Sequence, residues 1–129
     1  MTDIVISGTG LFTPAQSIDN EELVQAFNSF VDLHNAEHRS AIESGEMEAL
    51  EHSSSEFIEN ASGIKSRYVM DKEGILDPTR MCPNINERSN EDPSIQCDIS
   101  VDAARQAMAM AVKDAADIDA VIVACSNPQ

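Results

Sequence analysis

One short segment, residues 54–68, constrains the fold of this chain more than any other. Its sequence, SSEFIENASGIKSRY, predicts a short helix, a glycine stop and then a strand. A serine at its start can cap the helix, because its hydroxyl accepts a hydrogen bond from a free N–H group of the first turn. Gly63 allows the left-handed conformation that ends many helices. The strand that follows opens with two cations, Lys65 and Arg67.

Helical and strand patterns alternate along the rest of the chain. Residues 3–12 and 120–124 are apolar runs typical of strands, and the second of these predicts a strand buried on both faces. Apolar residues recur at helical spacing from residue 20 to about residue 42 and again in residues 99–113. Residues 71–98 are rich in proline, asparagine and aspartate and predict a long irregular loop. The sum is a mixed α/β chain.

The segment at residues 54–68 resembles the sequence (S/T)-(S/D)-(D/E)-W-I-x-x-R-(T/S)-G-I-x-x-R, found near the N-terminus of β-ketoacyl-acyl-carrier-protein synthase III enzymes. Three further pieces are similar to that family in the same order. Residues 4–14 resemble its first strand, I-x-G-x-G-x-x-x-P, residues 98–110 resemble its long helix, and residues 120–124 resemble the next strand. The order of the four pieces is more specific than any one of them.

This resemblance implies a fold and a domain organisation. The fold class is α/β, the N-terminal part of a thiolase-like fold in which helices flank a mixed sheet. Residues 1–129 would form the N-terminal thiolase-like half domain, incomplete as it stands. Residues 31–52 make the chain longer than the family at this point, so they are interpreted as a helical insertion.

The resemblance also implies an activity. These enzymes are acyltransferases that condense an acyl-thioester primer with malonyl-carrier protein, using a cysteine, a histidine and an asparagine. All three are expected beyond Gln129, so no catalytic residue is expected in this chain. The implied partner is acyl carrier protein, and the whole protein is expected to be a homodimer. No tightly bound cofactor is implied, since coenzyme A or carrier phosphopantetheine arrives as part of the substrate.

The candidate substrate- and carrier-binding residues are Phe57, Ser62, Lys65 and Arg67. In the family, an aromatic residue at the Phe57 position stacks on the adenine of coenzyme A, and an arginine four residues later covers the other face. Here that position is Ala61, so the same ring–adenine–guanidinium sandwich cannot form. The two cations still favour an anionic phosphopantetheine or carrier protein.

The net charge of −15 limits the partners of this chain. Such a charge repels phosphate, so nucleic acid and anionic membrane surfaces are not expected as partners. Acyl carrier proteins are acidic as well, so one would have to dock on a local positive patch, for which Lys72 and Arg80 extend the two cations named above. No apolar run approaches the ~18 residues of a membrane span. The three widely spaced cysteines, Cys82, Cys97 and Cys125, predict reduced thiols in the cytoplasm.

Other interpretations of the sequence compete with the synthase resemblance. His34, Glu37 and His38 match the H-x-x-E-H pattern of a zinc metallohydrolase, but no third protein ligand stands out, and no metal is expected. A non-catalytic acidic binding domain is the other alternative. Residues 8–10, Gly-Thr-Gly, lack the third glycine and the helix start of a dinucleotide-binding turn. Cys125 lacks a nearby helix start to activate it as a nucleophile.

Overall fold

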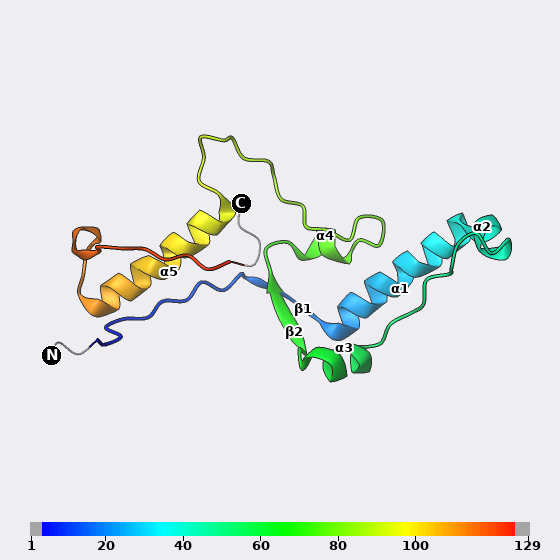
Figure 1. The fold of residues 1–129 in the computed structure, drawn as a ribbon, viewed down its shortest axis with the longest axis horizontal. Coiled ribbons are helices and arrows are strands. Elements are labelled where there is room, and N and C mark those ends of the chain that lie inside the picture. Colours follow the sequence, from blue (N-terminus) through cyan, green and yellow to red (C-terminus); the bar gives the residue numbers. More distant parts are fainter. Residues whose placement is uncertain (1–3, 126–129) are drawn as a thin grey trace. The chain divides into compact units, whose positions relative to one another are not determined.

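The computed structural model describes residues 4–125 of the chain, which form two compact units (Figure 1). Among these residues, one unit comprises 4–13 and 87–125, and the other spans Pro14–Asn86. We call them the terminal unit and the middle unit. Helices and a small sheet are present, so the chain is mixed α/β as expected. Residue 3, where the first predicted strand began, lies outside the described range.

The middle unit is built on a two-stranded antiparallel sheet and one long helix. Strand β1 (Gln16–Asp19) pairs with β2 (Ser66–Val69), with Ser17 opposite Tyr68. Helix α1 (Asn20–Glu37) follows β1 without a break. Ile18 of β1 and Ala26 and Val31 of α1 are the buried apolar side chains among residues 4–125.

The start of α1 is fixed by a capping box. The Asp19 carboxylate accepts a hydrogen bond from the Glu22 N–H at 2.8 Å, and the Glu22 carboxylate accepts one from the Asp19 N–H at 3.2 Å. Two backbone donors that a helix leaves unpaired at its N-terminus are thereby satisfied.

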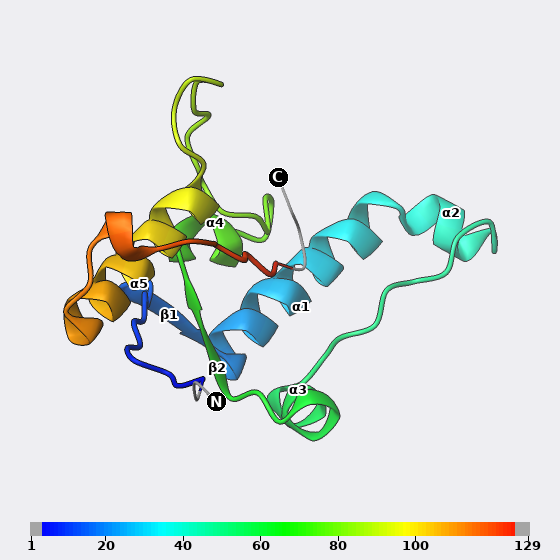
Figure 2. The ribbon, with the colours of Figure 1, turned by 60° about the vertical axis from the view of Figure 1, so that its left-hand side comes forward.

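After α1 the chain makes the short helix α2 (Arg39–Glu43) and turns at Gly45, whose φ of 78° lies in the left-handed region. Residues 47–53, the return segment, then run back beside α1 toward α3 (Figure 2). The range 31–52 is therefore helical only in its first half. Whether it is an insertion relative to the synthases stays a prediction.

Helix α3 (Ser55–Ser62) and its ends match the sequence prediction. The Ser54 hydroxyl caps it by accepting a hydrogen bond from the Phe57 N–H at 3.1 Å. Gly63 ends it in the left-handed conformation, with a φ of 71°.

The range 71–98 is less irregular than predicted. Helix α4 (Lys72–Leu76) occupies its beginning, and α5 (Ile95–Ala111) begins inside its end. The Asp71 carboxylate caps α4 through the Gly74 N–H at 3.1 Å, and it also accepts from the Asn84 N–H at 2.5 Å. Ser94 caps α5 by accepting a hydrogen bond from the Cys97 N–H at 3.1 Å, so this helix starts earlier than the predicted range of residues 99–113.

The terminal unit contains α5 and a short 3₁₀ helix, η1 (Ala115–Asp117), but no strand among its described residues. The predicted strands at residues 4–12 and 120–124 are therefore not formed. A strand exists only by hydrogen bonding to a neighbour, and the one ladder in residues 4–125 joins β1 to β2. Both segments lie alongside α5 instead, one against its backbone and one along a groove described below.

The glycine pair of the first segment is explained by this contact. Gly8 packs against the backbone of Ala107, and Gly10 packs against that of Ala103, so closely that a Cβ at either glycine would overlap a carbonyl oxygen of α5. Two residues of extended chain span about 6.6 Å, and four residues of helix rise about 6.0 Å. The two spacings agree, which lets both glycines meet the helix at once.

Candidate functional site

The candidate binding surface is one face of α3. Phe57 is 66% exposed, and Ala61, one turn later, is exposed as well. Residues four apart lie on the same face of a helix, so Ala61 leaves open space beside the Phe57 ring. This surface can offer a ligand an aromatic face without a guanidinium above it.

Ser62 and Lys65 lie at the end of α3 and just after it. The Ser62 hydroxyl donates to the Ile58 carbonyl at 2.7 Å and accepts from the Ile64 N–H at 3.1 Å, so it serves the local chain reversal. The Lys65 ammonium pairs with Glu59 at 3.0 Å, and its side chain is 78% exposed. Lys65 is thus an accessible cation beside the Phe57 helix.

Arg67 has a different environment. Its guanidinium donates to the Asn20 side-chain oxygen at 2.8 Å and to the Asp19 carbonyl at 3.4 Å. These bonds tie β2 to the junction between β1 and α1. Arg67 is therefore engaged with the protein, whereas the sequence analysis grouped it with Lys65 as a docking cation.

Asn20 is the residue of this region that sequence analysis missed. It is 6% exposed, the buried polar side chain among residues 4–125. Its side-chain N–H donates to the Ile64 carbonyl at 2.7 Å, and its backbone N–H donates to the Lys65 carbonyl at 3.2 Å. The sequence gives no local signal for these contacts, because the partners lie more than forty residues away.

The other two predicted cations are also engaged. Lys72 forms an ion pair with Glu22, and the Arg80 guanidinium donates to the Cys82 carbonyl at 3.2 Å. The Lys72 ammonium, by hydrogen bonding to Glu22, lowers the pKa of that carboxyl below its ordinary value. Lys65 thus remains the cation of this group most open to a partner.

Comparison with known proteins bears on what this surface serves. No protein-family model matches the chain. The chain is 60% identical, over 106 residues, to a protein named beta-ketodecanoyl-[acyl-carrier-protein] synthase from Pseudomonas aeruginosa. The resemblance to the β-ketoacyl-acyl-carrier-protein synthases is confirmed. The aligned residues are 82% of this chain and 30% of that synthase, so the chain spans about a third of its relative's length.

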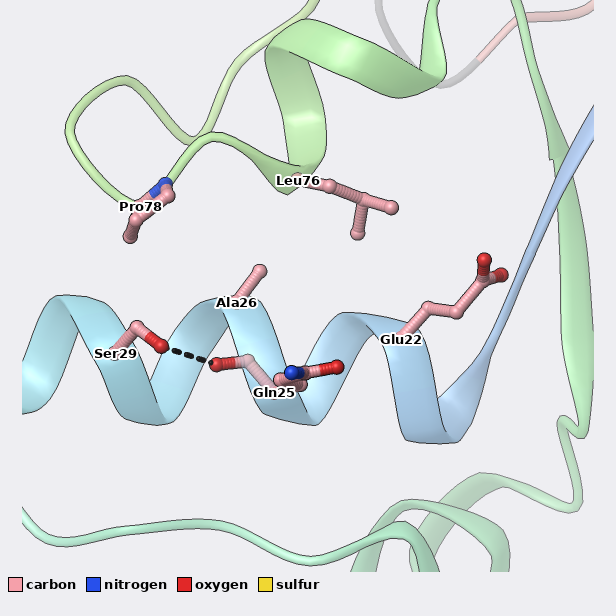
Figure 3. A pocket seen from close by; sticks show the side chains of 6 residues that line it. All are labelled: Glu22, Gln25, Ala26, Ser29, Leu76 and Pro78. Carbon is pink, nitrogen blue, oxygen red and sulfur yellow. Dashed lines mark hydrogen bonds between the residues drawn. The ribbon is translucent and has the colours of Figure 1, made fainter.

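Three hollows among the described residues of this chain bear on binding. The first, of about 270 Å³, lies between α1 and α4 (Figure 3). Leu76 and Pro78 face Ala26 across it. Glu22 lines the same hollow, and the lowered pKa of its carboxyl keeps it ionised near neutral pH, so it has no proton to donate as a general acid there.

The second hollow, of about 240 Å³, lies between α1 and α3. Its lining is mainly apolar and comprises Leu23, Val24, Phe27, Ser53, Ile58 and Met81. The third is an open groove of about 820 Å³ in the terminal unit, where residues 121–125 follow the N-terminal half of α5. Cys97 and Cys125 both line this groove.

The metallohydrolase interpretation finds no support. The rings of His34 and His38 stack with their centroids 4.3 Å apart, and a ring nitrogen of His38 lies 2.9 Å from the His34 carbonyl oxygen. Within residues 4–125, no three histidine, cysteine, aspartate or glutamate side chains come together as a metal site would require. Nor is any helix there both long enough and apolar enough to cross a bilayer.

Proposed function

We propose that the protein to which this chain belongs is a β-ketoacyl-acyl-carrier-protein synthase. It would be an acyltransferase of fatty-acid or related biosynthesis, with acyl carrier protein as its partner. The observation that carries this proposal is the 60% identity over 106 residues to a named synthase. Sequence similarity of this degree, spread over most of the chain, supports a shared chemistry for the whole protein.

The proposed reaction is a decarboxylative Claisen condensation. The acyl group of the primer passes from its thioester to an enzyme cysteine, and the primer's thiol is released. Malonyl-carrier protein then loses carbon dioxide, and the carbanion attacks the acyl carbonyl. A carbon–carbon bond forms, the cysteine thiolate leaves, and β-ketoacyl-carrier protein is the product. The resemblance implies, and we propose, that the reacting cysteine lies beyond Gln129.

The name of the relative suggests a primer. A β-ketodecanoyl product has ten carbons, of which two come from malonate after loss of carbon dioxide. The primer would then be an octanoyl thioester. The exposed Phe57 ring can contact the carrier part of such a thioester, and the missing arginine at Ala61 favours a primer held by other contacts than adenine stacking.

We further propose that the whole protein has the thiolase-like fold and works as a cytoplasmic homodimer. Support for a larger fold comes from the terminal unit, whose described residues include no buried one, while Ile122 is 93% exposed. Apolar side chains of this kind are normally covered in a finished fold. The thiols of Cys82 and Cys97 suit a reducing compartment.

A thiol-release assay tests the activity. The whole protein is mixed with octanoyl-coenzyme A and malonyl-carrier protein, and free coenzyme A is followed with a thiol reagent. We expect sustained release that requires malonyl-carrier protein and proceeds without added metal. Release that continues unchanged without the malonyl substrate would indicate a thioesterase and would contradict the proposal.

A further inference from the structure

Three asparagines of α1 hold the chain that runs back along this helix. Asn35 exchanges two hydrogen bonds with the backbone of Leu50, at 2.9 and 3.0 Å. Asn28 does the same with Ser53, at 3.1 and 2.8 Å. Each carboxamide thus pairs with one residue's N–H and C=O, as a neighbouring strand would. Asn20 adds the bonds to the Ile64 and Lys65 carbonyls described above.

The order of these contacts places α3 between two of them. The asparagine nearest the C-terminal end of α1 binds the earliest residue of the returning chain, and the asparagine nearest its N-terminal end binds the latest. The contact of Asn28 lies just before the Ser54 cap of α3, and the contacts of Asn20 lie just after Gly63. The asparagines are spaced by about two helical turns each, so they lie on one side of α1. Helix α3 is therefore attached to α1 at both of its ends.

Between these attachments, α3 contacts α1, but the packing is open. Helix α3 has no buried residue, and Ile58 lines the 240 Å³ hollow together with the α1 side chains Leu23 and Phe27. A helix of eight residues is also too short to be stable by itself. The hydrogen bonds at its ends therefore help to fix the position of α3.

We propose that Asn20 is a positioning residue for the thioester-binding surface on α3. Its side chain fixes the exit of α3 through the Ile64 carbonyl and fixes Arg67 through its oxygen. Asn28 fixes the entrance. Together they hold Phe57 in place before substrate arrives, so that binding does not have to order the helix. This inference rests on the proposed function.

Two variants and a matched control test it in the whole protein. Asn20→Ala removes both side-chain bonds. Asn20→Asp keeps an oxygen for Arg67 but replaces the donor to the Ile64 carbonyl, and it serves if the alanine variant folds poorly. Asn35→Ala is the control, since it also removes two side-chain hydrogen bonds from the same helix, away from α3.

Hydrogen exchange supplies a readout that needs no activity. In both Asn20 variants we expect the amides of residues 55–65 to exchange about tenfold faster than in the unmodified protein, the scale of one lost hydrogen bond. The control should speed exchange near residue 50 only. Unchanged protection of residues 55–65 in the Asn20 variants would overturn the proposal whatever the enzyme does.

Steady-state kinetics supply the second readout. We expect the KM for octanoyl-coenzyme A to rise about tenfold in the Asn20 variants with kcat nearly unchanged, because binding is weakened while the reacting groups are intact. Faster exchange with an unchanged KM would show that α3 does not serve the substrate. An unmodified protein with no condensing activity would instead refute the proposed function, and hydrogen exchange would still decide whether Asn20 holds α3.

Discussion

Lys65 and Arg67 lie two residues apart and carry the same charge, yet their environments differ. The Lys65 side chain is open to solvent beside Glu59, whereas the Arg67 guanidinium is bonded to Asn20 and to the backbone of Asp19. Alternate positions of an extended chain share a face, which is why the sequence suggested one patch made of both. At the scale of single residues, the partners of a charge decide its role.

Charge reversal should separate the two cations. Lys65→Glu should slow the reaction with malonyl-carrier protein several-fold and leave the Tm nearly unchanged, because exposed charges act mainly on encounter rate. Arg67→Glu should lower the Tm by several degrees, because it places a carboxylate against the Asn20 oxygen and the Asp19 carbonyl. The measurements are thermal melts and the rate against salt concentration. Equal thermal losses in both variants would contradict this assignment.

The Glu22–Lys72 pair predicts a pH dependence. Hydrogen bonding to Lys72 lowers the pKa of Glu22 in the folded protein, so the pair stabilises the fold above the ordinary carboxyl pKa. That contribution is lost as the pH falls through the lowered pKa. The Tm difference between the unmodified protein and Lys72→Met should therefore be largest near neutral pH and shrink toward pH 3. A Tm difference that grows as the pH falls would be opposite to this expectation and would refute the stabilising role of the pair.

Position 61 gives a prediction about substrate choice. Ala61→Arg together with Phe57→Trp would put a guanidinium beside an indole on the exposed face of α3. A cation–π contact of about 1–2 kcal/mol corresponds to roughly tenfold tighter binding. We expect the KM for acetyl-coenzyme A to fall by about that factor in the whole protein. If the unmodified protein already binds acetyl-coenzyme A as tightly as the double variant, this role for position 61 is wrong.

At the scale of elements, the sequence predicted what is locally determined. Helix α3, its Ser54 cap and its Gly63 stop depend on neighbouring residues, and all three were anticipated. The binding role of Phe57 came from the resemblance carried by the same segment, and it stays a prediction. Short polar caps and glycine stops act within one turn, so they can be read from sequence.

Elements that depend on distant partners were not anticipated. Strand β1 exists because Gln16–Asp19 pairs with a segment about fifty residues later, and Asn20 is buried for the same reason. Conversely, the apolar runs at residues 4–12 and 120–124 have strand character but form no ladder among the described residues. A run of apolar residues indicates that its side chains tend to be buried. A strand also requires a neighbouring strand to which its backbone can form hydrogen bonds.

The contact of the first segment with α5 can be tested at its glycines. Gly10→Ala would put a methyl group into the Ala103 carbonyl oxygen, and the two backbones would have to separate. Overpacking of this kind costs about 1–3 kcal/mol, which should lower the Tm of the whole protein. Thr13→Ala, at an exposed position of the same segment, is the matched control and should have little effect. A stable Gly10→Ala variant would show that this close approach is not maintained.

At the scale of the whole molecule, burial is uneven. Every residue buried among 4–125 lies in the middle unit, while the apolar runs of the terminal unit are open. The 106 residues aligned with the synthase relative are 30% of that protein. A protein of that relative's size would supply the further elements that such apolar side chains pack against. The open apolar runs support the proposal that this chain packs within a larger fold.

The mass of the carrier protein after reaction tests the central claim most directly. The whole protein is incubated with octanoyl-coenzyme A and malonyl-carrier protein, and the carrier is analysed by mass spectrometry. We predict that malonyl-carrier protein is converted to β-ketodecanoyl-carrier protein, with one carbon dioxide released for each product formed. Carrier protein that keeps its malonyl group, or that only loses carbon dioxide to become acetyl-carrier protein, would contradict the assignment as a condensing enzyme for this primer.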